Sequence, residues 1–536
     1  MKHYDSIIIG AGFSGIYQLY SLREKLKLKT LILESGDDLG GTWYWNRYPG
    51  ARCDSESFTY NFTFSKEIFE NWVWPERYSN QKVILKYLKY VVKNLNLKKD
   101  MLFSQKVMSA HYDEKNNLWN IQTNKGLKFS CKYLISALGC LSAANIPDID
   151  GLKDFNGEWY HTGNWPHQGV DFKNKNVAQI GVGSTGIQLA PEIAKTAKKL
   201  SIFQRSANYS IPAKNEIVND DFKKYVKENY EEIRGLVKET LTGHAFHFSK
   251  QSAMDVNDKE RKEIYDKAWN KGGLGFRGVF KDLTTNINSN NTVVDFIKEK
   301  VKSIVKNNNY AETVTNFNHP FATRRPTLNT NYYETFNEEH VELVDIKKEP
   351  IKKITKSGIE TSKKDYAFDI IIFATGYDAI TGALLAIDIV GKKKLSLKDL
   401  WKNGPLTFLG LQIPGFPNFF TITGPGSPSV LTNVPIAIEQ HVEFITDCID
   451  YMEKNKIKKI ETSNDAALKW RGEIDKEVNK TLIPESKNSW LYGGNVAGKP
   501  NVFMPYPGGL PKYREICRKI AKDNYKAFDL SKNKYN

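Results

Sequence analysis

Short apolar runs alternate along this chain with amphipathic stretches, which is the pattern typical of an α/β protein. The runs at Ser6–Ile9 and Thr30–Leu33 predict buried parallel strands, and the segment Ile16–Lys27 between them repeats its apolar residues at helical spacing. The same order of strand and helix returns at Asn176–Ile180 and Ile187–Ala197. Two such units predict two doubly wound domains.

Two other apolar stretches, Tyr133–Gly139 and Asp369–Tyr377, indicate strands that end near a glycine. Such strands are expected where the chain crosses from one domain to the other, so each of them marks a boundary. The second crossing would return the chain to the first domain. We therefore predict that the first domain is discontinuous in sequence.

Between 214 and 309 the pattern changes to charged segments with helical periodicity. These segments are Asp221–Lys238, Lys259–Trp269 and Val293–Lys306, and the glycine-rich stretch Gly272–Phe276 interrupts them. We predict an all-helical insertion in the second domain that covers a substrate cleft. A surface for a binding partner is the alternative.

The predicted fold class is therefore α/β, with two Rossmann-like dinucleotide-binding domains and a helical insertion. The length of 536 residues agrees, because about 150 residues per domain is usual. We place the first domain at 1–150 and 380–536, the second domain at 151–213 and 321–379, and the insertion at 214–320. The last residues, Asp529–Asn536, are expected to be a frayed polar tail.

Composition indicates a large soluble enzyme without a nucleic-acid partner. Hydrophobic residues make up 40% of the chain, and no apolar run approaches the roughly 18 residues of a membrane-spanning helix. The formal charge of +16 comes mostly from scattered lysines without a concentrated basic arm, so we expect a solvated surface. Five widely spaced cysteines suggest the reducing cytoplasm. We expect a monomer or a weak homodimer.

The first glycine fingerprint, Gly10–Gly15, follows a predicted strand and precedes a predicted helix. In this context Gly10 makes the tight turn, Gly12 lets the backbone approach a pyrophosphate, and Gly15 lets helix and strand pack closely. Glu34 follows about twenty residues later, where a carboxylate binds ribose hydroxyls and rejects a 2′-phosphate. FAD or NAD fits this half. The expected contacts also include Phe13 and Ser14.

The second fingerprint, Gly181–Gly186, has the same context but a different partner. Arg205 stands at the position that corresponds to Glu34, with Ser206 and Gln204 beside it. A guanidinium suits the 2′-phosphate of NADPH. The expected contacts of this half are Gly181, Gly183, Ser184, Thr185, Gly186, Gln188, Arg205 and Ser206.

Two longer motifs make the chain resemble the flavin-dependent Baeyer–Villiger monooxygenases over nearly its whole length. The first is F-x-G-x-x-x-H-x-x-x-W-P, which lies between the two fingerprints. The second is G-G-x-W-x-x-x-x-Y-P-G-x-x-x-D, which follows the first fingerprint. Their positions are Phe155, Gly157, His161, Trp165 and Pro166 in one, and Gly40, Gly41, Trp43, Tyr48, Pro49, Gly50 and Asp54 in the other.

The resemblance implies that NADPH reduces FAD, and that a C4a-peroxyflavin formed with O₂ attacks a ketone to give an ester or lactone, with sulfoxidation as a side activity. Such a family site needs a cation that does not release its proton. Arg325 matches the active-site arginine, and Asp54 would orient it. Arg324 matches the position that approaches the NADPH phosphate.

The resemblance also implies further contacts. Trp490 would pack over NADP⁺ from a mobile loop, with ordinary aromatic core as the alternative. The substrate pocket would include Val430, Leu431 and Thr432. Other cofactor contacts would be Thr42, Trp43, Tyr44, Trp45, Arg52, Cys53, Tyr60, Val107 and Val434.

Three alternatives remain beside this interpretation. An N- or S-hydroxylating flavin monooxygenase would share the fold and cofactors but lacks the motif that ends at Asp54. A nucleotide-sensing protein would bind FAD without turnover. A flavin disulfide reductase would need a paired dithiol, and no C-x-x-C or C-x-x-x-x-C occurs. We expect His161 to act as a hydrogen-bonding or domain-coupling residue rather than in proton transfer, and no metal site is predicted.

Overall fold

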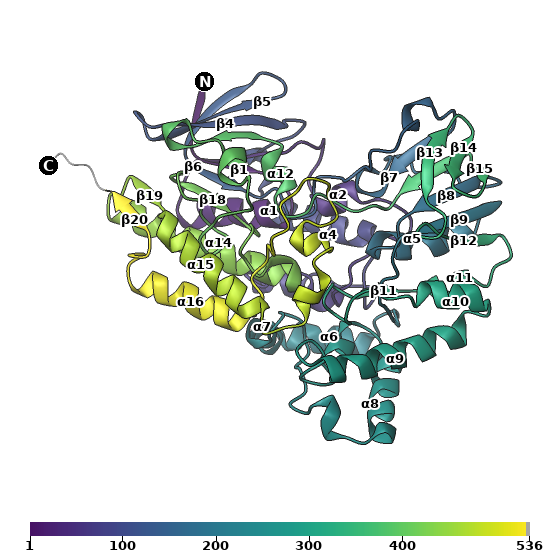
Figure 1. Ribbon diagram of the computed structural model, residues 1–536. Coiled ribbons are helices and arrows are strands. Elements are labelled where there is room, and N and C mark those ends of the chain that lie inside the picture. The colour runs from purple at the N-terminus through teal and green to yellow at the C-terminus, as the bar shows by residue number, and fades with distance from the viewer. Residues whose placement is uncertain (532–536) are drawn as a thin grey trace.

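The computed structural model describes residues 1–531. Its first sheet contains β1, the strand that ends just before Gly10 (Figure 1). The strand order is β17-β4-β5-β6-β1-β2-β3, with β18 also paired to β6. The central strand β1 pairs in parallel with β2 and β6, as expected for a strand buried on both faces. The bounds are β1 Lys2–Ile9, β2 Thr30–Leu33, β3 Met101–Leu102, β4 Val107–Asp113, β5 Leu118–Thr123, β6 Lys128–Ser136, β17 Asp388–Val390 and β18 Phe419–Thr421.

The second sheet contains β8, the strand that ends just before Gly181. All of its strands are parallel, in the order β12-β9-β8-β16-β7. Its strands are β7 Glu158–His161, β8 Asn176–Ile180, β9 Lys199–Gln204, β12 Val341–Asp345 and β16 Ile370–Phe373. A separate antiparallel sheet adjoins it, with β13 Ile351–Thr355, β14 Gly358–Thr361 and β15 Asp365–Ala367. The α/β fold class is confirmed.

The two glycine turns show the close packing that their fingerprints predict. Helix α1, Phe13–Tyr20, follows β1, and a Cβ atom built on Gly15 would lie 1.9 Å from the carbonyl oxygen of Gly10. Helix α5, Ser184–Ala194, follows β8, and a Cβ atom on Gly186 would lie 2.3 Å from the carbonyl oxygen of Gly181. Only glycine allows these approaches.

The insertion is helical, and its helices lie below the two sheets in Figure 1. They are α6 Asp220–Glu228, α7 Tyr230–Glu239, α8 Asp258–Lys271, α9 Ile287–Ile304 and α10 Asn308–Val314. The segment Asp221–Lys238, for which helical periodicity was expected, is helical but forms two helices, because the chain breaks at Asn229. The amide of Asn229 donates to the carbonyl of Tyr225, a local side-chain contact that competes with helical continuation.

The remaining helices pack around the first sheet and the loops between the sheets. Helix α14 packs on α1 and on α16, and Lys512 of α16 forms ion pairs with Glu473 and Glu477 of α15. The short strands β10 Ser210–Pro212 and β11 Thr327–Asn329 pair with each other beside the insertion. The bounds are α2 Thr42–Trp45, α3 Lys66–Glu70, α4 Gln81–Asn94, α11 Tyr332–Thr335, α12 Gly382–Leu385, α13 Leu397–Leu400, α14 Val434–Lys454, α15 Asn464–Val478 and α16 Leu510–Lys522.

The C-terminal segment differs from the expected tail. Asp529–Ser531 forms strand β20, which pairs antiparallel with β19, Lys459–Glu461. The expectation of a frayed tail is therefore wrong for these residues, and 532–536 lie outside the described part of the chain. Pairing with β19 gives the backbone N–H and C=O groups of β20 hydrogen-bond partners. The polar composition of the segment does not reveal this.

Helix α14 carries a buried carboxyl group, that of Glu439, of which 1% is exposed. It accepts hydrogen bonds from the backbone N–H and the hydroxyl of Thr63. Burial, together with the charge of Glu443, raises the pKa of Glu439 to about 7. The folded protein therefore holds this proton more tightly than the unfolded chain does.

The Glu439→Gln variant tests this linkage. Because the folded-state pKa is raised, the stabilisation by this group is full below about pH 4.5 and disappears as the pH rises through about 7. Between pH 5 and pH 8 the free energy of unfolding of the wild type should fall by on the order of 2–3 kcal/mol because of this group. The free energy of unfolding of the variant should not show this fall. The melting temperature at both pH values measures this. The control is Asp450→Asn on the same helix, and an unchanged pH dependence in Glu439→Gln would contradict the assignment.

Candidate active site

Both glycine turns open onto one cavity of about 1760 Å³, which lies at the carboxyl ends of β1 and β8. This is where open α/β sheets bind nucleotides. Most of the residues predicted from the sequence line it. They are Gly10, Gly12, Phe13, Ser14, Glu34, Thr42, Trp43, Trp45, Arg52, Cys53, Asp54, Tyr60, Val107, Gly181, Gly183, Ser184, Thr185, Gln188, Arg205, Ser206, Arg324, Arg325, Val430, Val434 and Trp490.

Five predicted residues do not line this cavity. Gly15 and Gly186 lie behind their turns, where they pack helix against strand. The hydroxyl of Tyr44 donates to Asp37 at 2.6 Å, which directs this side chain elsewhere. Leu431 packs against the core of the first domain, and the hydroxyl of Thr432 donates to the carbonyl of Ser429 at 2.7 Å. Of the three predicted substrate-pocket residues, only Val430 reaches the cavity.

The helices that follow the two turns begin without side-chain caps. In α4, α8 and α15, by contrast, the side chains of Asn80, Asn257 and Ser463 accept from the first turn. The caps of α1 and α5 are Gly12 and Gly183, which leave their first N–H groups facing the cavity. Free N–H groups at a helix start bind anions, so both starts fit a pyrophosphate.

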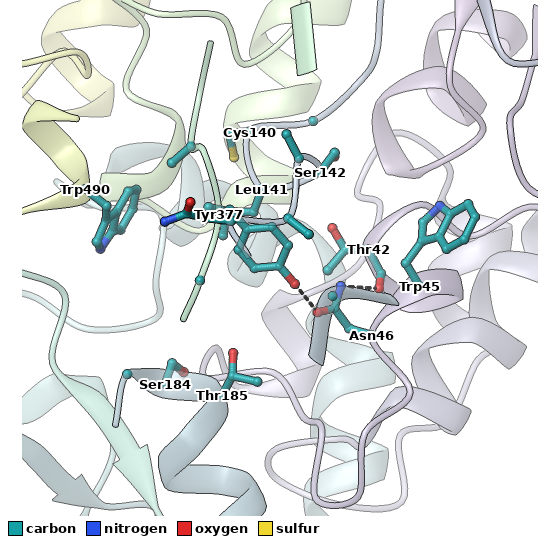
Figure 2. A pocket seen from close by; sticks show the side chains of 18 of the residues that line it. Thr42, Trp45, Asn46, Cys140, Leu141, Ser142, Ser184, Thr185, Tyr377 and Trp490 are labelled. Carbon is teal, nitrogen blue, oxygen red and sulfur yellow. Dashed lines mark hydrogen bonds between the residues drawn. The ribbon is translucent and has the colours of Figure 1, made fainter. Parts of the chain in front are cut away.

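Figure 2 shows Ser184 and Thr185 at the start of α5 pointing into this space. A Cβ atom built on Gly183 would meet no heavy atom within 4 Å. The space beside this glycine is therefore open to a ligand. This agrees with the close backbone approach that the fingerprint predicts.

The residues at the ends of β2 and β9 differ in charge, as the sequence indicates. Glu34 is 4% exposed, and its oxygens accept from the N–H groups of Ala11 and Gly36, both at 2.7 Å. Arg205 is exposed, and Arg324 lies close enough that burial and the charge of Arg205 lower its pKa. Neither guanidinium forms a salt bridge within residues 1–531. Two unpaired cations at one place fit a phosphate.

Arg325 is fixed by contacts from two segments that are far apart in the sequence. Its Nε and Nη2 atoms donate to the two carboxylate oxygens of Asp54 at 2.6 and 2.8 Å. Nη1 donates to the carbonyls of Val430 and Thr432 at 3.0 and 3.2 Å. A guanidinium has five N–H groups, so one N–H on Nη2 stays available to a ligand. Burial favours a lower pKa for Arg325, but the charge of Asp54 raises it above its usual value.

The loop that carries Asp54 is clamped to the start of α5. Tyr48 donates to the side-chain carbonyl of Gln188 at 2.8 Å, and the Gln188 amide donates to the backbone carbonyl of Arg52 at 3.1 Å. Gly50 has a φ of +82°, and a Cβ atom there would lie 2.4 Å from the Gln188 carbonyl. Only glycine fits this close to the backbone carbonyl of Gln188, which explains why the second motif has a glycine at position 50. Arg52 itself is paired with Glu76 at 3.0 Å.

His161 does not line the cavity. It is buried, and its Nδ1 atom accepts from the N–H of Gly163 at 3.0 Å. Burial lowers its pKa, so the ring is neutral at physiological pH. The rings of His161 and Tyr377 meet edge to face, with their centroids 6.1 Å apart. This contact joins the linker to the second crossing. These contacts support the hydrogen-bonding interpretation over proton transfer.

Comparison with known proteins agrees with this geometry. Residues 5–228 match the model of the family "Flavin-binding monooxygenase-like". The chain is 40% identical to a Baeyer–Villiger monooxygenase of Pseudooceanicola batsensis, over 97% of this chain and 95% of that protein. It is 37% identical to a phenazine N-monooxygenase of Lysobacter antibioticus, over 98% of this chain and 97% of that protein.

A solved structure of cyclohexanone monooxygenase from Rhodococcus sp. Phi1, bound to NADP⁺, superposes with a TM-score of 0.96 at 37% identity. The match covers 99% of this chain and all of that one. This chain belongs to the Baeyer–Villiger monooxygenases. The resemblance stated from its two motifs is confirmed.

This family member has a further group of cavity residues that the sequence did not single out. Tyr377 lines the cavity and stands near the centre of Figure 2; its hydroxyl donates to the side-chain oxygen of Asn46, whose amide in turn donates to the carbonyl of Thr42. Asn495 donates to the carbonyl of Tyr377 at 2.8 Å and accepts from Asn145 at 3.1 Å. The sequence held one signal for this group of residues, because Tyr377 is the last residue of the apolar run Asp369–Tyr377 that marks the second crossing.

This network joins the two crossings to the loop that carries Trp490. Trp490 lines the cavity on the side of Tyr377 opposite Trp45 and Asn46 (Figure 2). It belongs to a single helical turn, Trp490–Tyr492. Its predicted place beside the coenzyme is therefore compatible with the fold.

The Arg205→Glu variant tests the 2′-phosphate site. The change removes a charge-assisted contact and adds repulsion, so the KM for NADPH should rise roughly 10- to 100-fold. The KM for NADH, which lacks that phosphate, should change less than about 3-fold, and steady-state kinetics with both coenzymes measures this. An equal loss for NADPH and NADH would place the phosphate elsewhere.

Proposed function

We propose that this protein oxygenates ketones to esters or lactones, with FAD, NADPH and O₂. The observation that carries this proposal is the bidentate contact of Arg325 with Asp54 in the wall of the cavity that both glycine turns share. The family supports it, because the name Baeyer–Villiger denotes this reaction. A small-molecule ketone and O₂ are the partners that follow.

The charged side chains in each half of the cavity determine which cofactor binds there. FAD binds at the turn Gly10–Gly15, where Glu34 favours a ribose without a phosphate. NADPH binds at the turn Gly181–Gly186, with its 2′-phosphate between Arg205 and Arg324. When bound, NADPH reduces FAD, and the reduced flavin reacts with O₂ to supply the oxygen that is transferred.

Arg325 stabilises negative charge on that oxygen without giving up a proton. An arginine stays charged at working pH, and Asp54 keeps the charge in one place. We assign the remaining N–H on Nη2 as the donor to that oxygen. Asp54 is a positioning residue, because both of its oxygens are used by Arg325.

The groups around Arg325 are weak acids, which favours a nucleophilic oxygen. Burial raises the pKa of the Cys53 thiol and of the Tyr60 hydroxyl well above their usual values. Burial, with the charges of Arg325 and Arg277, lowers the pKa of His244 and keeps its ring neutral. A negatively charged oxygen is therefore not protonated by these neighbours. Electrophilic transfer to nitrogen or sulfur would need that proton.

N- or S-hydroxylation is the second candidate function. The likeness to a phenazine N-monooxygenase supports it, at 37% identity over nearly the whole chain. A panel of ketones, aromatic N-heterocycles and sulfides, with purified protein, FAD, NADPH and air, separates the two by mass spectrometry of the products. Ester formation supports the first function. N-oxidation without any ester would establish the second.

The Arg325→Ala variant tests the role of the guanidinium. Reduction of FAD by NADPH should stay within about 3-fold of the wild type, while ester formation should fall by about 10²–10³-fold, because one preorganised donor is lost. NADPH oxidation in air should then release hydrogen peroxide. Rapid-mixing spectra and product analysis measure the two steps, and Arg471→Ala, away from the cavity, is the control. Ketone oxygenation at the wild-type rate would refute the role.

The cell compartment, the oligomeric state and the domain boundaries belong to the same proposal. No helix within residues 1–531 has the length and apolarity needed to cross a bilayer. All five cysteines are free, which supports a reducing cytoplasm.

We propose a monomer or weak homodimer without a nucleic-acid partner. The proposed domain boundaries lie near residues 150, 213, 320 and 379. The return of β17 and β18 to the first sheet supports the last boundary.

A further inference from the structure

Ser486 joins a cation of the cavity wall to the segment that carries Trp490. Its hydroxyl oxygen accepts a hydrogen bond from Nε of Arg324 at 2.8 Å, and the residue is buried, with 2% of its surface exposed. Within residues 1–531, Arg324 has no other hydrogen bond and no salt bridge. Ser486 is therefore the one group in this part of the chain that orients the guanidinium through a hydrogen bond.

The other end of the Arg324 guanidinium is open to the cavity. Arg324 lines the cavity together with Arg205, and its two Nη atoms are not among the buried polar atoms that lack a partner. Their four N–H groups are therefore available to a ligand. The charge of Arg205 adds to burial in lowering the pKa of Arg324. An anion between the two guanidinium groups offsets their repulsion and binds the free N–H groups.

A short run of backbone hydrogen bonds leads from Ser486 to Trp490. Ser486 ends the helical turn Ile483–Ser486, and its carbonyl accepts from the N–H of Ser489 at 3.0 Å. The carbonyl of Ser489 accepts in turn from the N–H of Tyr492, also at 3.0 Å. Trp490 lies inside this run and lines the cavity (Figure 2). The place of Ser486 therefore bears on the place of the indole ring.

The far end of the same segment is anchored without any contact to the two cations. Lys499 forms a salt bridge with Asp378, and its Nζ atom donates to the carbonyl of Ala379 at 2.8 Å. Neither Lys499 nor Asp378 lines the cavity. The segment 486–499 is thus held at both ends, and a ligand on Arg324 acts on the Ser486 end.

We propose that Ser486 is a positioning residue that couples binding of the 2′-phosphate of NADPH to the position of Trp490. A guanidinium is planar and rigid, so a phosphate on its Nη atoms also fixes the direction of the Nε–H that Ser486 accepts. The phosphate then both selects the coenzyme and fixes the Trp490 side of the cavity. This inference rests on the proposed placement of the phosphate between Arg205 and Arg324.

Binding of NADP⁺ and NAD⁺ to the oxidised holoenzyme tests the coupling without turnover. Because coupling between two sites is reciprocal, loss of the Ser486 hydroxyl must weaken the coenzyme that carries the phosphate. Ser486→Ala should raise the Kd for NADP⁺ about 5- to 10-fold and the Kd for NAD⁺ less than 2-fold. Calorimetric titration measures both constants, and FAD content and melting temperature report folding.

Hydrogen exchange of the backbone amides of Ser489 and Tyr492 reports the segment itself. At saturating coenzyme, NADP⁺ should slow their exchange in the wild type about 10-fold more than NAD⁺ does. In Ser486→Ala the two coenzymes should have the same effect. A Kd for NADP⁺ that stays at the wild-type value, or a difference in exchange that persists in Ser486→Ala, would overturn the coupling.

Two further variants serve as matched controls in the same segment. The hydroxyl of Ser489 has no hydrogen-bond partner within residues 1–531, so Ser489→Ala should keep the wild-type difference between NADP⁺ and NAD⁺. Lys499→Met removes the other anchor and should speed exchange equally with both coenzymes. A loss of the difference in Ser489→Ala, or a loss confined to NADP⁺ in Lys499→Met, would count against a specific role for Ser486.

Failure of the proposals on which this inference rests has different signatures. If the phosphate binds elsewhere, Arg205→Glu weakens NADP⁺ and NAD⁺ equally, and the coupling falls with that placement. If the protein does not oxygenate ketones, no ester forms from any ketone of the panel. The titrations and the exchange measurements involve no substrate, so they still decide the role of Ser486 in that case.

Discussion

The ion pair of Arg325 and Asp54 joins three lengths of chain that are far apart in sequence. Asp54 comes from the loop after α2, Arg325 from the segment after the insertion, and the carbonyls of Val430 and Thr432 from the segment before α14. Asp54 and the two carbonyls lie in the two sequence parts proposed for the first domain, and Arg325 lies in the second domain. The ion pair therefore forms only when the two domains have taken their places around the cavity.

A partly buried ion pair is not in itself evidence of stability, because desolvation offsets much of the attraction. Here Asp54 and the two carbonyls satisfy four donors of Arg325, and one N–H is left over. The arrangement keeps a cation in a fixed orientation at the cavity wall. Preorganisation of this kind stabilises charge without the reorganisation that water would need.

Local motifs predicted much of this arrangement. Strands β2 and β8 have the predicted bounds, and the contacts of Gly15 and Gly186 follow from the fingerprint spacing. The pairing of Arg325 with Asp54 was expected from the family resemblance, which implies that Asp54 orients Arg325. These features depend on few neighbouring residues.

Features that depend on distant contacts could not be predicted in the same way. The side-chain directions of Leu431 and Thr432 are set by packing in the core and by Ser429, so membership in a pocket segment did not place them in the cavity. The strand at Asp529–Ser531 exists because β19 pairs with it.

The discontinuous first sheet has a consequence for the order in which the molecule is completed on the ribosome. The second sheet needs no strand beyond Phe373, whereas the first waits for β17 and β18, which end at Thr421. Pairing of β6 with β18 spans almost three hundred residues, a long-range contact that forms slowly. The first sheet, whose strands begin to be synthesised earliest, is therefore the last of the two to be completed.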